Sequence, residues 1–407
     1  MVVFGANGAK RCGAPWYELN ISAPENYASA CCYYAGEKPE WSDQPKTLDD
    51  YWNSPALRAL RRLQADPSPP AHHGCSDCYW YKNAPPGVEI YDLSPEHPPV
   101  GLSELQAANW RLAKAEYVAG AEIVASRPLR VLANFGFACN LSCTMCHQVP
   151  RRLDIRRQLS ADHLLSWADD LERAIDVCLV GGEPFTLPQA VKFMRKFVSM
   201  ERFEPVRLQI TTNGTVLHKH WEMLYRKKRL TFGISIDGIG ETYERVRLGG
   251  RWNDVERNIL RVRETRAKDR PEWAMATVAN IYKSSLPDLP NFAKWHVRHD
   301  VQSYFYNFIA TPGAEETFYR ENFRDNPELL ADMPEWREHF DAAIEVYEQA
   351  GERPEGVRPE IGFLKHFKGQ VEQSLARAAI RILPDARRNN DAAGIRCRVR
   401  AGDHRYR

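Results

Sequence analysis

The sequence predicts an α/β protein whose centre is a partial, open (β/α)6 barrel, with a small cysteine-rich domain before it and a helical extension after it. Three observations carry this prediction. Apolar, β-rich segments alternate with helical segments from residue 129 onward. Most of the ten cysteines fall into two groups, one within the first 84 residues and one near residues 139–146. Helical character dominates after about residue 312, and 407 residues exceed the length of one average domain.

The overall composition is that of an ordinary globular protein. Hydrophobic residues make up 43% of the chain and charged residues 27%, and a net charge of +2 gives no reason to expect nucleic acid as a partner. No apolar run approaches the ~18 residues that span a membrane. The first residues, MVVFGANGAKRCG, place basic residues after a short apolar patch, which is the wrong order for a signal peptide. We therefore expect a cytoplasmic protein without a membrane partner, whose cysteines bind metal or serve redox chemistry rather than form disulfides.

Residues 1–84 are predicted to form the cysteine-rich domain, and residues 85–128 a proline-rich linker followed by a helix. The segment NAPPGVEIYDLSPEHPPVG carries five prolines, which break helices and central strands. Ser103 and Gln106 have the spacing of a capping box, and apolar residues then repeat at helical intervals until Pro128. The repeating residues are Leu105, Leu112, Ala119 and Ile123. We expect this helix to join two domains.

Residues 129–311 are predicted to form the barrel. The β-rich runs are LRVLANFGF, DVCLVGG, VRLQITTNG, LTFGISIDG, WAMATVANI and VQSYFYNF, with helical stretches between them, for example at 160–174 and 187–200. Alternation of strands and helices implies a parallel sheet with right-handed crossovers. Six strands are too few for an eight-stranded barrel but enough for a curved, open one. Chemistry in such sheets gathers at the carboxyl ends of the strands.

Residues 312–407 are predicted to form the helical extension. PEWREHFDAAIEVYEQAG has a helical pattern, and the chain from Arg377 to its last residue contains nine arginines against three aspartates. A charge run of this kind is usually solvated. We therefore expect the last part of the extension to be a basic tail in water.

Three cysteines lie within eight positions after the first predicted barrel strand. Cys139, Cys143 and Cys146 have the spacing C-x3-C-x2-C. Three thiolates can hold a cubane iron–sulfur cluster by three of its four irons, which leaves the fourth iron open. An open iron can be chelated by the amine and carboxylate of an amino acid.

Further motifs end the next three predicted strands: Gly181-Gly182-Glu183-Pro184, Thr211-Thr212-Asn213-Gly214 and Ser235-Ile236-Asp237-Gly238. Together with the cysteine triplet they resemble the radical S-adenosylmethionine (radical SAM) superfamily. The resemblance implies a TIM-like partial barrel, a [4Fe–4S] cluster on the triplet, and S-adenosylmethionine at the open iron. It also implies reductive cleavage of S-adenosylmethionine to a 5′-deoxyadenosyl radical, with an electron from a donor such as flavodoxin or ferredoxin.

The same resemblance assigns residues to S-adenosylmethionine. Glu183 would meet the ammonium group of the cofactor, and Arg247, in ETYERVRLGG, its carboxylate. The segment departs from the family pattern at Tyr243, where histidine is common, and at Leu248, where glycine is common. Met145 would contact adenine. The full predicted set is Gly181, Gly182, Glu183, Pro184, Asn213, Ser235, Asp237, Arg247 and Met145.

The second cysteine set is Cys12, Cys31, Cys75 and Cys78. Four ligands close a metal site, and on geometry both zinc and an iron–sulfur cluster are admissible. The layout resembles the twitch module, a short relative of the SPASM domain, and this resemblance implies a second, auxiliary [4Fe–4S] cluster. In the family the module normally follows the barrel, whereas here it comes first. Cys31 is preferred over Cys32 because Asn26, five residues before Cys31, stands where the family usually has glycine.

The substrate is predicted less directly. A single four-cysteine module and no evident leader-binding domain favour dehydrogenation or epimerisation of a sugar or aminocyclitol. The alternative is a ribosomal-peptide maturase of the SPASM/twitch type. A third hypothesis, an iron–sulfur electron carrier without catalysis, would not need the motifs at residues 181–184, 211–214 and 235–238.

Overall fold

The computed structural model describes most of the chain. The described residues are 2–4, 10–31, 36–42, 44, 46–66, 74–75, 78, 97–146, 148, 157–306, 319–352 and 358–382. Most of the predicted proline-rich linker, the last part of the predicted basic tail, and Cys32 lie outside these residues. Within them, no helix has the length and apolar character needed to cross a membrane.

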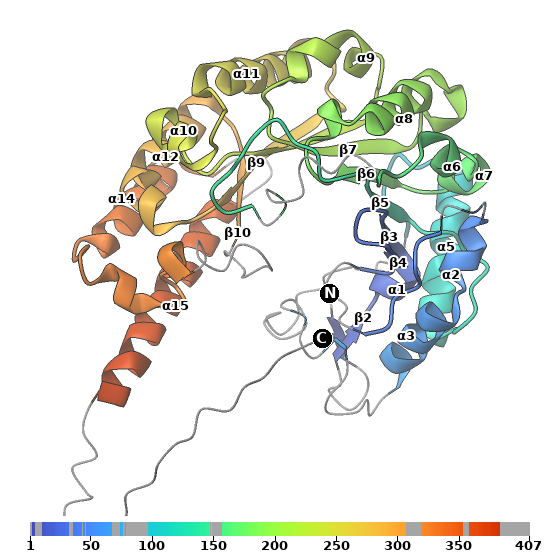
Figure 1. Cartoon of the computed structure of the whole chain (residues 1–407), viewed down its shortest axis with the longest axis horizontal. Coiled ribbons are helices and arrows are strands. Elements are labelled where there is room, and N and C mark those ends of the chain that lie inside the picture. Colours follow the sequence, from blue (N-terminus) through green and yellow to red (C-terminus); the bar gives the residue numbers. More distant parts are fainter. Residues whose placement is uncertain are drawn as a thin grey trace, which may run out of the picture.

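The main sheet of the described chain has eight strands in the order β10-β9-β8-β7-β6-β5-β3-β4. All neighbouring pairs are parallel except β3 and β4, which are antiparallel. The sheet curves without closing, and helices cover its outer side (Figure 1). The predicted α/β class, a partial TIM-like barrel, is therefore confirmed.

Each of the six predicted runs contains one strand. These strands are β5 (Arg130–Asn134), β6 (Asp176–Val180), β7 (Arg207–Thr212), β8 (Leu230–Ser235), β9 (Ala274–Asn280) and β10 (Ser303–Tyr306). In β7, buried and half-buried residues alternate: Leu208, Ile210 and Thr212 are buried, and Arg207, Gln209 and Thr211 are only half-buried. This period of two is the expected pattern for a strand with one covered face.

The sheet also receives two strands from the amino-terminal region, β3 (Glu18–Ser22) and β4 (Tyr27–Ser29). β3 runs parallel to β5, with Ser22 opposite Asn134. Residue 84 is consequently not a boundary of the sheet, although the assignment of residues 1–84 to an auxiliary-cluster domain remains a prediction. The same region contributes β1 (Val2–Phe4), β2 (Lys10–Cys12), α1 (Ala14–Tyr17), α2 (Leu48–Trp52) and α3 (Pro55–Ala65).

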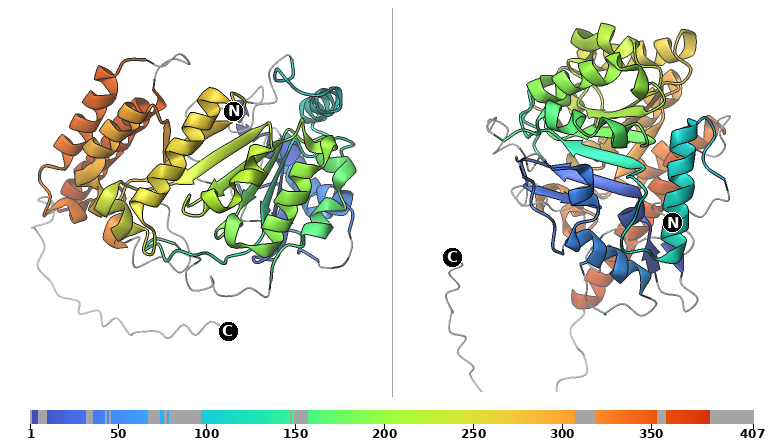
Figure 2. Two further views of the ribbon diagram at one scale, coloured as in Figure 1. Left: turned by 90° about the horizontal axis from the view of Figure 1, so that it is seen from above. Right: turned by 90° about the vertical axis from the view of Figure 1, so that its right-hand side faces the viewer.

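The outer helices pack apolar faces on the sheet. They are α6 (Ala161–Leu165), α7 (Ala168–Leu171), α8 (Pro188–Ser199), α9 (Trp221–Tyr225), α10 (Gly240–Val246), α11 (Trp252–Lys268) and α12 (Leu289–His299). In α8, for example, Ala190, Phe193, Met194 and Phe197 are buried at helical spacing. The predicted carboxyl-terminal helices are present as α14 (Trp336–Gln349) and α15 (Pro359–Ile382), beside α12 and β10 (Figure 2).

Helix α5 (Glu104–Ala119) has the predicted capping box but not the predicted extent. It stops at Gly120, whose left-handed backbone (φ 67°) ends the helix well before Pro128. The apolar repeat lies on its outer side, since Leu105 and Leu112 are 45% and 41% exposed. The buried side of the helix is partly polar. It includes Gln106, whose side-chain amide is satisfied by donating to the carbonyl oxygen of Ala174 (2.6 Å).

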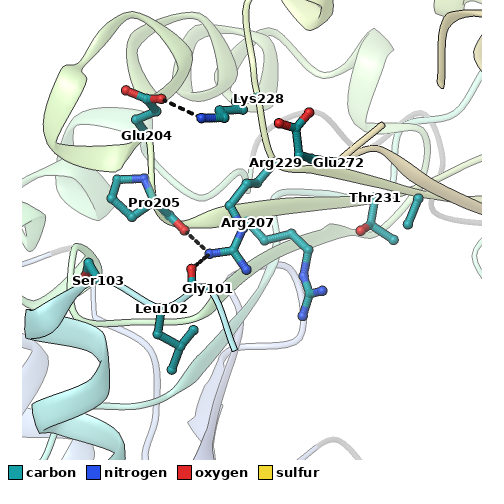
Figure 3. Close-up of a pocket in the computed structure, with 11 residues that line it drawn as sticks. Gly101, Leu102, Ser103, Glu204, Pro205, Arg207, Lys228, Arg229, Thr231 and Glu272 are labelled. Carbon is teal, nitrogen blue, oxygen red and sulfur yellow. Dashed lines mark hydrogen bonds and ion pairs between the residues drawn. The ribbon is translucent and has the colours of Figure 1, made fainter. Parts of the chain in front are cut away.

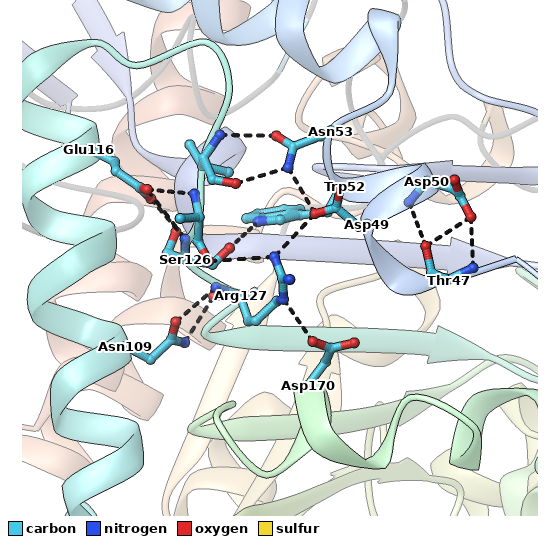
Figure 4. A network of polar contacts seen from close by, with 12 residues as sticks. Thr47, Asp49, Asp50, Trp52, Asn53, Asn109, Glu116, Ser126, Arg127 and Asp170 are labelled. Atoms are coloured by element: carbon cyan, nitrogen blue, oxygen red, sulfur yellow. Dashed lines mark hydrogen bonds and ion pairs between the residues drawn. The ribbon is translucent and has the colours of Figure 1, made fainter.

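A polar network attaches the amino-terminal region to the barrel (Figure 4). Asn53 exchanges hydrogen bonds with the backbone of Val124 (2.9 and 3.0 Å), and the Trp52 indole donates to the carbonyl oxygen of Ser126 (2.9 Å). Arg127 forms ion pairs with Asp170 (2.7 Å) and Asp49 (3.1 Å). These contacts hold α2 against both the segment before β5 and helix α7.

Candidate functional site

The predicted site residues follow four adjacent strands. The cysteine triplet follows β5, residues 181–184 follow β6, Asn213 follows β7 and Asp237 follows β8. These strands are neighbours and parallel, so their carboxyl ends meet at one edge of the sheet. The structure therefore brings the predicted residues of all four motifs together at the end of the barrel where catalytic residues are expected.

The cluster loop, residues 138–146, is held by the backbone on both sides. Ser142 and Thr144 donate to the carbonyl oxygens of Leu248 (2.9 Å) and Val246 (3.0 Å) after helix α10. On the β6 side, the amide of Gly182 donates to Gly136 (2.8 Å) and that of Glu183 to Ala138 (2.9 Å). The loop is thus fixed between the ends of β6 and α10.

The motif Gly181-Gly182-Glu183-Pro184 (GGEP) needs its two glycines because the cluster loop comes close to the end of β6. Gly181 has a φ of +125°, a backbone conformation that residues other than glycine rarely adopt. A Cβ atom at Gly182 would overlap the carbonyl oxygen of Ala138 and lie 2.6 Å from that of Phe137. The resemblance places these glycines in the set predicted for S-adenosylmethionine, and the structure shows that they also admit the backbone of the cluster loop.

The thiols of the triplet are close enough to influence each other's ionisation. Burial raises the pKa of the Cys139 thiol, and the pKa of Cys143 rises to about 11 for the same reason. Cys146 adds to both shifts, whereas the Arg247 guanidinium opposes the shift at Cys143. Side-chain donors point at two of the sulfurs: Asn213 Nδ2 lies 3.7 Å from Cys139 Sγ, and Arg247 Nη1 lies 3.9 Å from Cys143 Sγ.

These features fit a cluster bound by thiolates, because clustered thiols that are buried ionise only when positive charge is supplied. No group of three or more Cys, His, Asp or Glu side chains among the described residues is placed to hold a metal ion directly. A cubane, which has sulfide between its irons, spreads its cysteines more widely than a single ion does.

Glu183 is completely buried at this edge. Its carboxylate accepts hydrogen bonds from Thr212 Oγ1 (2.9 Å), the Asn213 amide (2.7 Å) and the Phe185 amide (3.1 Å). Burial raises the pKa of Glu183 to about 7, although these donors oppose the shift. The carboxylate is therefore well oriented, but among the described residues it forms no ion pair, and only the more distant Arg247 opposes its raised pKa by charge. A cationic ligand would stabilise it.

Asp237 and Arg247 form a buried ion pair with 2.7 Å between Oδ2 and Nη2. The other oxygen of Asp237 accepts from the amide of Asn280 (2.8 Å), which fixes the carboxylate. The sequence interpretation assigned both residues to S-adenosylmethionine separately, whereas the structure pairs them. Arg247 still directs a second nitrogen toward Cys143, as described above.

The remaining predicted residues occupy the rim of this arrangement. Met145 is half-buried and packs against Val246 and Tyr282 in a small apolar cluster. Ser235 is half-buried at the end of β8. Tyr243, where the family commonly has histidine, is buried and its ring packs 5.6 Å from that of Trp252.

Two residues outside the predicted set position members of it. Thr212 donates to both oxygens of Glu183, and Asn140 accepts from Asn213 Nδ2 (2.9 Å). Thr212 stands directly before Asn213 on a strand next to β6, so its position beside Glu183 follows from strand order. The sequence alone carried no signal for the contact of Asn140.

The four cysteines of the second set also come together, although Cys12 and Cys78 are 66 positions apart in the sequence. Burial raises the pKa of Cys12 to about 12, and Cys31 and Cys78 raise it further. Burial likewise raises the pKa of Cys75, with additional contributions from Cys12, Cys31 and Cys78. The amide of Cys78 donates to the carbonyl oxygen of Cys75 (3.0 Å). This donor set fits a metal or cluster for the same reason as the triplet.

A cavity of about 660 Å³ lies at the opposite end of the sheet, at the amino ends of β7, β8 and β9 (Figure 3). Arg207, Arg229 and Thr231 are among its lining residues. Arg229 donates to the carbonyl oxygens of Gly101 (3.0 Å) and Pro205 (2.8 Å). Its guanidinium therefore ties loops together, and the cavity is remote from the cysteine triplet.

The parallel, open barrel thus gathers three thiols, a buried carboxyl and an Asp–Arg pair at its carboxyl end, and this set of groups fits a thiolate-bound cluster. Residues 133–281 match the model of the radical SAM superfamily. The cofactors of this superfamily are a [4Fe–4S] cluster and S-adenosylmethionine.

Curated relatives match part of the chain. It is 25% identical over 192 residues to a serine-type anaerobic sulfatase-maturating enzyme of Bacteroides thetaiotaomicron, covering 44% of this chain and 46% of the relative. It is 24% identical over 188 residues to a cysteine-type anaerobic sulfatase-maturating enzyme of Clostridium novyi, covering 42% and 48%. It is 27% identical over 162 residues to a pre-heme d1 synthase of Dinoroseobacter shibae, covering 39% of each. The matches thus span about half of these relatives, or less.

Among solved structures, Streptococcus suis SuiB bound to S-adenosylmethionine is 16% identical to this chain. The likeness covers 56% of this chain and 52% of that one, with a TM-score of 0.42.

Proposed function

We propose that this protein is a radical SAM enzyme that modifies a side chain of a peptide or protein. The observation that carries the proposal is the meeting of the three thiols with Glu183 and Arg247 at one edge of the barrel. Two of the curated relatives are sulfatase-maturating enzymes, whose substrates are proteins by name. The comparisons therefore favour the peptide alternative over the sugar or aminocyclitol that the sequence interpretation put first.

The chain's own residues would bind and orient the cofactors. When bound, the cluster and S-adenosylmethionine supply a 5′-deoxyadenosyl radical that removes hydrogen from the substrate. Cys139, Cys143 and Cys146 would hold three irons, and Glu183, buried and held by three donors, would accept the ammonium group. Arg247, fixed by Asp237, would attract the carboxylate. Asn213, Ser235 and Met145 would line the nucleoside, and Gly181, Gly182 and Pro184 shape the loop.

We further propose that Cys12, Cys31, Cys75 and Cys78 hold a second [4Fe–4S] cluster. The convergence of these four thiols, of which Cys75 is buried, supports this proposal. Such a cluster would accept an electron from the substrate radical, and an external donor such as flavodoxin or ferredoxin would reduce the first cluster.

The activity test is anaerobic reconstitution with iron and sulfide, followed by dithionite and S-adenosylmethionine. We expect 5′-deoxyadenosine and methionine, and we expect Cys143→Ala to abolish both. Cys178→Ala is the matched control, because Cys178 is buried in β6 with its sulfur 3.1 Å from Arg130 Nε. A reconstituted protein that forms neither product would overturn the enzyme proposal and favour an electron carrier.

The substrate test uses peptides from the proteins encoded beside the gene of this protein. We expect one of them to raise 5′-deoxyadenosine formation and to change in mass. The third relative is named for a heme precursor, which keeps a small molecule as the second candidate. Stimulation by a sugar or aminocyclitol, with none by the peptides, would replace the peptide proposal.

A further inference from the structure

Gln64 lies between two cysteines of the second set. The residue lies in the last turn of helix α3 and is only 4% exposed. Its Oε1 accepts a hydrogen bond from the Cys12 amide (2.8 Å), and its Nε2 donates to Cys75 Sγ (3.2 Å). Both ends of the side-chain amide are therefore used, and each is used by a different cysteine.

The orientation of this amide is set by the protein. A flipped amide would direct Nε2 at the N–H group of Cys12, which would place two donors against each other. The Cys12 amide thus requires the oxygen on its side and directs the N–H group at Cys75. The backbone amide of Cys12 therefore determines that the Gln64 side chain donates to the sulfur of Cys75.

Helix α3 holds Gln64 rigidly. Arg61, one turn earlier, is fully buried and donates to the carbonyl oxygens of Pro15 (2.9 Å) and Trp52 (2.8 Å). Leu57 and Leu60 of the same helix are buried, and Ser54 caps its first turn through the Leu57 amide (3.3 Å). The helix is therefore anchored to the segment after Cys12 as well as to α2.

We propose that Gln64 is a positioning residue that tunes the second cluster by donating a hydrogen bond to the sulfur of Cys75. The inference rests on the proposed cluster at Cys12, Cys31, Cys75 and Cys78. A sulfur that binds iron carries negative charge, and this charge increases when the cluster is reduced. An N–H donor stabilises the reduced form and so raises the reduction potential.

The test uses the full chain with Cys139, Cys143 and Cys146 replaced by alanine, so that only the second site can hold iron. After anaerobic reconstitution, this parent should contain about four irons per chain. Gln64→Glu keeps an acceptor for Cys12 but removes the donor to Cys75. We expect the reduction equilibrium of this variant to shift at least tenfold toward the oxidised cluster. Its reduction potential, followed by electron paramagnetic resonance, should therefore fall by at least about 59 mV for one electron.

Gln64→Leu provides a neutral variant, and Gln189→Glu is the matched control. Gln189 accepts from the Ala161 amide (3.1 Å) on the outer helices, so its change should leave the potential unaltered. Loss of iron from folded Gln64 variants, with iron kept in the parent, also supports the role. Unchanged potentials in Gln64→Glu and Gln64→Leu, with iron kept, overturn the inference alone. A parent without iron, or with zinc, overturns the second cluster and this inference with it.

Discussion

The buried carboxyl of Glu183 makes the stability of the protein depend on pH. The pKa of this group rises from the ordinary 4.5 to about 7 because the carboxylate is removed from water. The folded state therefore binds the proton more tightly than the unfolded state. The contribution of Glu183 to stability is most favourable below about pH 4.5 and falls as the pH rises to about 7. The loss is at most about 3 kcal/mol.

The raised pKa of Glu183 gives a prediction for the stability of the protein without cofactors. Between pH 5 and pH 7.5, the free energy of unfolding of the wild type should fall relative to that of Glu183→Gln by about 1–3 kcal/mol. Urea denaturation of both proteins at several pH values measures the difference. Comparing the pH dependence removes the constant cost of placing an amide among three N–H and O–H donors. A difference that does not change with pH would show that Glu183 titrates normally in the folded protein.

At the scale of elements, the cluster loop and the GGEP segment depend on each other. The hydrogen bonds from Gly182 to Gly136 and from Glu183 to Ala138 join the end of β6 to the loop that follows β5. No side chain fits between them, because a Cβ at Gly182 meets the backbone of Phe137 and Ala138. Backbone atoms cannot move aside as the end of a flexible side chain can.

Gly182→Ala should therefore separate the loop from β6 and displace Cys139. We expect the variant to lose iron from the triplet after reconstitution while the second site keeps its own. Iron analysis and the resonance spectrum of the reduced protein measure this. Gly362→Ala is the control, since Gly362 lies in helix α15 and a Cβ there meets nothing within 4 Å. It should stabilise the protein by about 0.5–1 kcal/mol; full iron at both sites in Gly182→Ala would refute the argument.

Local patterns were sufficient for six strands of the sheet, but not for the seventh and eighth. The segment of β3 alternates Glu18, Asn20 and Ser22 with Leu19 and Ile21, yet its partner β5 lies more than 100 residues later. Pairings of such separation leave no periodic signal. The structure shows what the pairing of β3 with β5 produces. Opposite charges alternate across four adjacent strands at paired positions of the sheet. This row consists of Glu18, Arg130, Asp176 and Arg207.

The site shows the same division between local and distant information. The triplet and Glu183 belong to short motifs, so the sequence alone predicted their type and spacing. The roles of Thr212 and Gln64 depend on which elements become neighbours in space, and for this reason neither was predicted. The exposed apolar residues of α5 have a related cause, since the helix buries amides whose partners are carbonyl groups of distant segments.

At the scale of the whole molecule, the amino-terminal region and the barrel share one sheet and a set of buried polar contacts. β3 covers the edge of β5, and Arg61 donates to the carbonyl oxygen of Glu122 (3.1 Å) as well as to Pro15 and Trp52. Burial lowers the pKa of Arg61 to about 10, so this guanidinium depends on its carbonyl partners. Polar groups of the amino-terminal region and of the barrel consequently depend on each other for their hydrogen bonds.

A chain that begins at residue 97 should therefore fail to fold by itself. Removal of β3 would expose the backbone edge of β5, and removal of α2 would leave Val124 and Ser126 without their partners on Asn53 and Trp52. We expect the truncated chain to aggregate, or to lose its near-ultraviolet circular dichroism and its cooperative thermal transition. A chain that ends at residue 382 controls for truncation as such and should unfold like the full protein. If residues 97–407 instead unfold cooperatively and bind iron at the triplet, the barrel is an independent domain and the division near residue 84 gains its first support.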